Sequence, residues 1–232
     1  MQTAKSFVAK LARDNEALFQ AGALQVKAYF ESEPSQEALV KHFVGRMVNE
    51  RMNMAELSQR IASMPADSSP EELQLLAKQA MDEANHFRMV KEVIEHITGE
   101  ELDVAAAIRA EAAKPTAKGA ALLAKYEAES DPLALATYQF IAEGRAERNW
   151  DMMAECIKDP FISQRYAKIA RDEGFHANIG RITLERLATD SDSQARVEQL
   201  AAQMRRDLFE ISCANSTPTA EARQLVAEAY GW

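Results

Sequence analysis

Two short segments of this chain place a carboxylate and an imidazole at a spacing that suits a metal ion. They run from Asp82 to His86 (DEANH) and from Asp172 to His176 (DEGFH), and they lie ninety residues apart. On a helix, residues three apart leave the same face, so the Glu and the His of each segment would point to one place. One Glu-x-x-His is a weak signal, but two copies, each preceded by Asp, predict metal ligands.

The residues before the two segments repeat as well. A proline stands thirteen residues before each motif glutamate, at Pro70 and at Pro160. Ser69 and Asp159 precede these prolines, and both residue types are good N-caps for a helix whose first residue is proline. The sequence therefore predicts two helices that begin alike and carry the same Glu-His pair at the same depth.

The composition predicts an all-α protein. The 232 residues contain only eight glycines and seven prolines, and 47% of them are hydrophobic, so a folded, helix-rich chain is expected. No stretch alternates apolar and polar residues between turns, as a strand would. The expected helices are, approximately, 3–30, 38–64, 70–98, 132–158, 160–187, 194–213 and 220–230.

The four long middle helices would form two hairpins. Short loops join the members of each hairpin, and a connection of about thirty residues, 100–130, joins the hairpins. One long crossover between helix pairs is typical of the ferritin-like four-helix bundle. We expect one domain, 1–232, with a bundle core of about 38–187 and additional helices at both ends.

A dinuclear carboxylate site in such a bundle needs one further Glu from each of the other two helices. The candidates are Glu50 or Glu56 in the expected helix 38–64, and Glu143 or Glu147 in the expected helix 132–158. Glu50 lies about thirteen residues before its helix ends and Glu143 about fourteen, so the hairpin repeat favours this pair. Glu147 is a candidate extra ligand or cavity residue. Gly144 either permits a π-bulge or open space next to the metal, or is an incidental small residue in helix packing.

Electrostatics favours a metal in this setting, because buried carboxylates without partners cost several kcal/mol each. Two divalent ions would balance the charge of four glutamates. Carboxylate and imidazole ligands suit iron or manganese. Asp82 and Asp172 would then accept hydrogen bonds from the ligand imidazoles, each from the His of the opposite motif helix.

This ligand pattern resembles the ferritin-like di-iron carboxylate superfamily. The Asp-Glu-x-x-His motif in both halves resembles its oxygen-activating branch, which includes bacterial multicomponent monooxygenase hydroxylases, the phenylacetyl-CoA epoxidase catalytic subunit, aldehyde-deformylating oxygenases and the tRNA-modifying hydroxylase. The chain departs from the monooxygenase pattern at Asn85 and Phe175, where Arg is often found. The resemblance implies metal ligands at Glu50, Glu83, His86, Glu143, Glu173 and His176.

The activity that this resemblance implies is that of an O2-dependent oxidoreductase. Two Fe ions, or a Mn/Fe pair, would use O2 as co-substrate to oxidise a small organic substrate. Electrons would come from a separate reductase or ferredoxin, since the chain has no flavin or nicotinamide motif. The alternatives are a rubrerythrin-like peroxidase or ferroxidase, and a non-catalytic subunit of an oxygenase complex.

Charge and composition exclude other classes of function. The net charge of −9 argues against a nucleic-acid partner. No apolar run is long enough for a membrane span, and no signal peptide is expected, so we expect a cytoplasmic protein. The additional helices at the two ends could form a homodimer interface. Two cysteines, Cys156 and Cys213, are too few for a four-cysteine metal site. His42 and His96 lie near helix ends, where we expect surface roles or roles stabilised by the helix dipole, and no ligand role.

Overall fold

The computed structural model describes residues 2–113, 122, 125–126, 131–215 and 217–232. All regular secondary structure in these residues is helical, which confirms the all-α prediction. Contacts divide the chain into two compact units, and each is described by itself below. One unit comprises Pro34–Ala124, and the other comprises Met1–Glu33 together with Lys125–Trp232. That the whole chain forms one domain stays a prediction.

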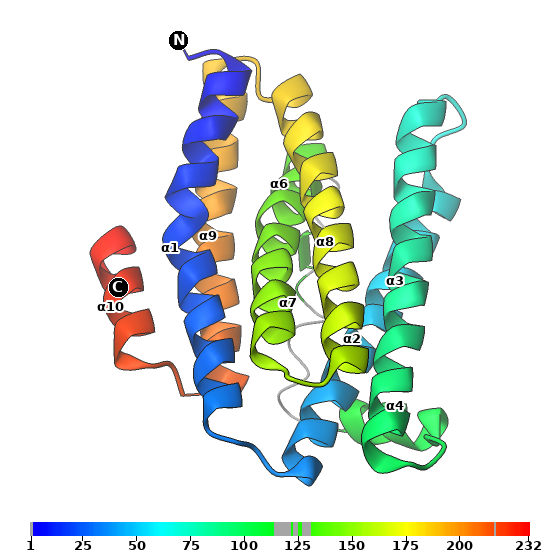
Figure 1. Cartoon of the computed structure of the whole chain (residues 1–232). Helices are drawn as coiled ribbons and strands as arrows, with labels where there is room; N and C mark the ends of the chain where they lie inside the picture. The colour runs from blue at the N-terminus through cyan, green and yellow to red at the C-terminus, as the bar shows by residue number, and fades with distance from the viewer. Residues whose placement is uncertain (1, 114–121, 123–124, 127–130, 216) are drawn as a thin grey trace. The chain divides into compact units, whose positions relative to one another are not determined.

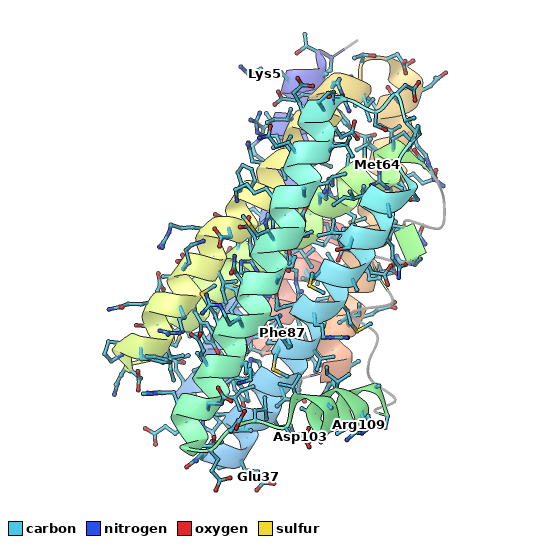
Figure 2. All side chains as sticks on the ribbon, turned by 90° about the vertical axis from the view of Figure 1, so that its right-hand side faces the viewer. Lys5, Glu37, Met64, Phe87, Asp103 and Arg109 are labelled. Carbon is cyan, nitrogen blue, oxygen red and sulfur yellow. The ribbon has the colours of Figure 1, made fainter. Side chains whose placement is uncertain are left out.

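The unit Pro34–Ala124 is built on a helical hairpin. Its helices are α2 (Gln36–Ser63) and α3 (Pro70–Thr98), and α4 (Val104–Ala112) packs on α2. Ser69 caps the start of α3 by accepting a hydrogen bond from the backbone, and Gly99 ends it in the left-handed region, at φ 72°. Figure 2 shows α2 between the labels Glu37 and Met64, its C-cap, with Arg109 of α4 and Asp103, the N-cap of α4, near the Glu37 end.

The other unit packs four long helical segments together. They are α1 (Ala4–Glu31), the segment from Pro132 to Cys156, α8 (Pro160–Leu187) and α9 (Ser191–Asn215), and the short α10 (Ala220–Tyr230) packs on α1. In Figure 1, α9 runs alongside α1 and α10 lies on the other side of α1. The core of this unit includes the buried rings of Trp150 and Tyr166, whose centroids are 4.9 Å apart.

The segment from Pro132 to Cys156 differs from the uninterrupted α-helix that the sequence predicts. It consists of α6 (Pro132–Tyr138), a π-helix η1 (Gln139–Glu143) and α7 (Gly144–Cys156). A π-helix inserts one extra residue into a turn and so changes which side chains share a face beyond it. Gly144 follows η1 directly, as the π-bulge alternative requires.

Other helix limits agree closely with the prediction. The helices α3, α8 and α10 begin at the predicted residue and end at the predicted residue, because proline, N-cap and glycine signals act locally. Of the connection 100–130, α4 is helical, while residues 114–121, 123–124 and 127–130 lie outside the described part.

No helix in the described ranges has the length and apolar character to cross a bilayer.

Candidate metal centre

The hairpin unit holds one compact trio of potential ligands, Glu50 from α2 and Glu83 with His86 from α3. All three residues are at most 2% exposed. The Nδ1 atom of His86 lies 3.4 Å from Oε2 of Glu50 and 3.7 Å from Oε2 of Glu83. The trio offers ligand atoms that lie within 4.8 Å of one another. We call this trio the hairpin half-site.

The second unit holds a trio of the same composition. Glu143 is the last residue of the π-helix η1, and Glu173 and His176 lie one turn apart on α8. All three are at most 6% exposed, and Nδ1 of His176 is 3.0 Å from Oε2 of Glu173. Their ligand atoms also lie within 4.8 Å of one another. We call this trio the α8 half-site.

Helix geometry accounts for the Glu-His pairs, and the π-helix accounts for Glu143. In both motifs the three-residue spacing places Glu and His on one helix face, as the sequence predicts. Glu143 depends on η1, which packs against α8. A Cβ on Gly180 of α8 would overlap the backbone of η1, so glycine permits this close approach. The contact brings the backbone that carries Glu143 down onto α8.

Glu147, the candidate extra ligand, is exposed. Its carboxylate lies over Gly174, where a Cβ would be 2.7 Å from Oε1 of Glu147. Partial burial of the carboxylate raises the pKa of Glu147, while the charge of Arg148 lowers it to a smaller extent. Within the described residues, Glu147 is in neither trio. Glu56, the other candidate in α2, is half-buried and is likewise in neither trio.

Asp82 and Asp172 are both buried beside the motif glutamates, and each is held by a lysine of its own helix. Lys78 donates a hydrogen bond to Oδ2 of Asp82, and Lys168 donates one to Oδ2 of Asp172. The predicted contact of each Asp with the imidazole of the opposite motif helix stays a prediction. The lysines were not expected, although the sequence carries their signal, since Lys-x-x-x-Asp-Glu-x-x-His occurs in both motifs.

The remaining histidines and the cysteines lie outside both trios. His42 is half-buried rather than on the surface, because its Nε2 atom is enclosed. This burial, together with Arg46, lowers the pKa of His42 to about 3. His96 is exposed, as expected. The two free cysteines, one half-buried and one exposed, form no disulfide.

Each trio combines two carboxylates and one imidazole in a buried place, so each could hold a metal ion. Comparison with known proteins adds no further argument: no protein-family model, no curated protein and no solved structure matches this chain. Any function assigned to the chain must therefore be argued from the chemistry of these two trios.

Proposed function

We propose that the hairpin half-site and the α8 half-site together bind two divalent metal ions in one dinuclear carboxylate centre. The observation that carries this proposal is the duplication of one buried trio. Two glutamates and one histidine recur in both units, with the motif Glu thirteen residues after the first residue of its helix. Such a centre is typical of a ferritin-like four-helix bundle.

The ligand types and their charge fit this centre. Each trio has a formal charge of −2 with a neutral imidazole, and one divalent ion balances it. Leaving two ionised carboxylates together in a buried place would cost several kcal/mol per group. Oxygen and imidazole ligands without thiolates favour iron or manganese over structural zinc or an iron–sulfur cluster.

The reaction class that this ligand set supports is the O2-dependent oxidation of a small organic substrate, as in a monooxygenase. Iron or manganese held there would supply electrons for the reduction of O2. The protein's own groups would bind and orient the ions, and the low exposure of the six ligands would exclude bulk water. A separate reductase or ferredoxin would restore the electrons.

Two alternatives use the same trios. A rubrerythrin-like peroxidase or ferroxidase has less support, because Glu147, which would imitate the additional rubrerythrin glutamate, is exposed. Rapid turnover of peroxide or Fe(II) without any organic product would favour that alternative. A non-catalytic subunit of an oxygenase would bind less than about one metal ion per chain.

Metal reconstitution tests the proposal. Anaerobic Fe(II) loading of the full chain, followed by gel filtration and metal analysis, should give about two ions per chain. Glu83→Ala and His176→Ala should each reduce this stoichiometry while the helical circular dichroism is retained. Glu56→Ala is the matched control, because Glu56 lies on α2 and in neither trio. If the Glu83 and His176 variants retain the full metal content, the ligand assignment is wrong.

A further inference from the structure

Two lysines occupy identical positions in the duplicated motif. Lys78 and Lys168 each stand four residues before the Asp and five before the ligand Glu. In both units the ammonium group is bonded to Oδ2 of that Asp, at 2.5 Å for Lys78. The side chains of the lysines are 42% and 49% exposed, whereas those of Asp82 and Asp172 are only 7% and 12% exposed.

In the described part of the chain, the burial of the acid separates these pairs from five more exposed helix pairs of the same spacing. Elsewhere the chain also pairs a basic residue with an acid four positions later on a helix. In those pairs the side chain of the acid is 25% to 64% exposed; the acids compared are Asp14, Glu31, Glu92, Glu95 and Glu185. Exposed pairs of this kind contribute little to stability. A lysine that meets a buried carboxylate has a larger effect, because water screens that carboxylate less.

The lysine reduces the net negative charge of each half-site and its neighbouring Asp. Each trio contributes −2, and the neighbouring Asp brings the group to −3. The lysine reduces this to −2, which is the charge that one divalent ion balances. Without a metal, the lysine still pairs a positive charge with the Asp of this buried group.

We propose that Lys78 and Lys168 are built-in counter-charges of the metal centre, which stabilise its metal-free form. The inference rests on the proposed function, because it takes the two trios as metal ligands. Lysine and metal ion offset the same negative charge, so each weakens the stabilising effect of the other. Replacing the lysine therefore destabilises the metal-free protein more than the metal-loaded protein, and it strengthens metal binding.

The direction in which metal affinity changes on replacement of the lysine distinguishes a counter-charge from a residue that only orients the Asp. Loss of a group that orients a metal ligand through a hydrogen bond typically weakens metal affinity by about 10- to 100-fold. Loss of a nearby positive charge should instead strengthen the binding of a cation, by about five-fold for a partly solvated lysine.

The experiment measures Co2+ binding and thermal stability in the full chain, at one pH, for Lys78→Met and Lys168→Met separately. Lys91→Met is the control on α3, since Lys91 pairs with the more exposed Glu95. Arg181→Met is the control on α8, since Arg181 is 41% exposed and pairs with Glu185. Lys78→Arg preserves the charge and should behave as the wild type does.

We expect each lysine variant to lower the Tm of the metal-free protein by about 3 °C relative to its control. Co2+ should restore most of that difference, and the Co2+ affinity should rise about five-fold. The inference is overturned if Lys78→Met and Lys168→Met match their controls, or if they bind Co2+ about ten-fold more weakly. A wild type that binds no Co2+, shown by no Tm shift and no cobalt absorption bands, would refute the proposed function instead.

Discussion

The backbone nitrogen of Phe140 lies 2.4 Å from the position that a Cβ on Gly180 would occupy. The carbonyl oxygen of Ala136 lies 2.8 Å from the same point. An alanine at position 180 would therefore overlap backbone atoms of both α6 and η1. Backbone atoms cannot rotate away as the end of a flexible side chain can. The absence of a side chain at Gly180 is therefore what allows η1, which carries Glu143, to pack directly on α8.

Gly180→Ala should destabilise the protein although alanine is the better helix former. The overlap costs about 1–3 kcal/mol, and the gain in helix propensity, at most about 1 kcal/mol, does not offset it. Because η1 must move, Co2+ binding by the α8 half-site should weaken as well. Urea unfolding and Co2+ titration measure the two effects.

Gly45→Ala is the control for this substitution. A Cβ on Gly45 of α2 would meet only the carboxylate of Glu111, at 3.4 Å, and that carboxylate can move. This variant should be as stable as the wild type or more stable. Equal stability of the Gly180 and Gly45 variants would show that the approach of η1 to α8 does not depend on glycine.

Glu143 and Glu147 should differ in metal binding although they lie four residues apart. Glu143 is buried within the α8 half-site, whereas Glu147 is exposed and in neither trio. We expect Glu143→Ala to lower Co2+ affinity by about ten-fold or more, and Glu147→Ala to change it by less than about two-fold. Isothermal titration of the two variants side by side decides this, and a large loss at Glu147 would make it a ligand.

His42 should make the protein less stable as the pH falls below about 6.5. Burial lowers the pKa of His42 to about 3 in the folded chain, so between these values the unfolded chain binds a proton that the folded chain does not. The stabilising effect of the neutral ring is present above pH 6.5 and is lost toward pH 3. At pH 5 the loss amounts to up to about 2 kcal/mol.

The measurement compares urea unfolding at pH 7 and pH 5 for the wild type, His42→Gln and His96→Gln. The His42 variant should lose less stability on acidification than the wild type. The exposed His96 serves as the control, and its variant should follow the wild type. An unchanged pH dependence in His42→Gln would contradict a buried neutral ring.

Much of the helical framework could be predicted from the sequence. Pro70 and Pro160, each after a capping residue, mark the first residues of α3 and α8, and Gly99 marks the residue after α3. These signals act through hydrogen bonds and backbone angles within a few residues, so neighbours in space hardly alter them. The face shared by Glu and His in each motif follows from helix geometry for the same reason.

Only the tertiary structure decided which of the candidate residues are buried. The hairpin repeat in the sequence favours Glu143 over Glu147 as a ligand, but it does not show that packing of η1 against α8 buries the first and leaves the second exposed. The sequence repeats the lysine in both motifs, but only the burial of Asp82 and Asp172 distinguishes these two pairs from exposed helix pairs of the same spacing. Burial and close backbone approach depend on residues distant in the chain, and a local pattern of residue types does not contain that information.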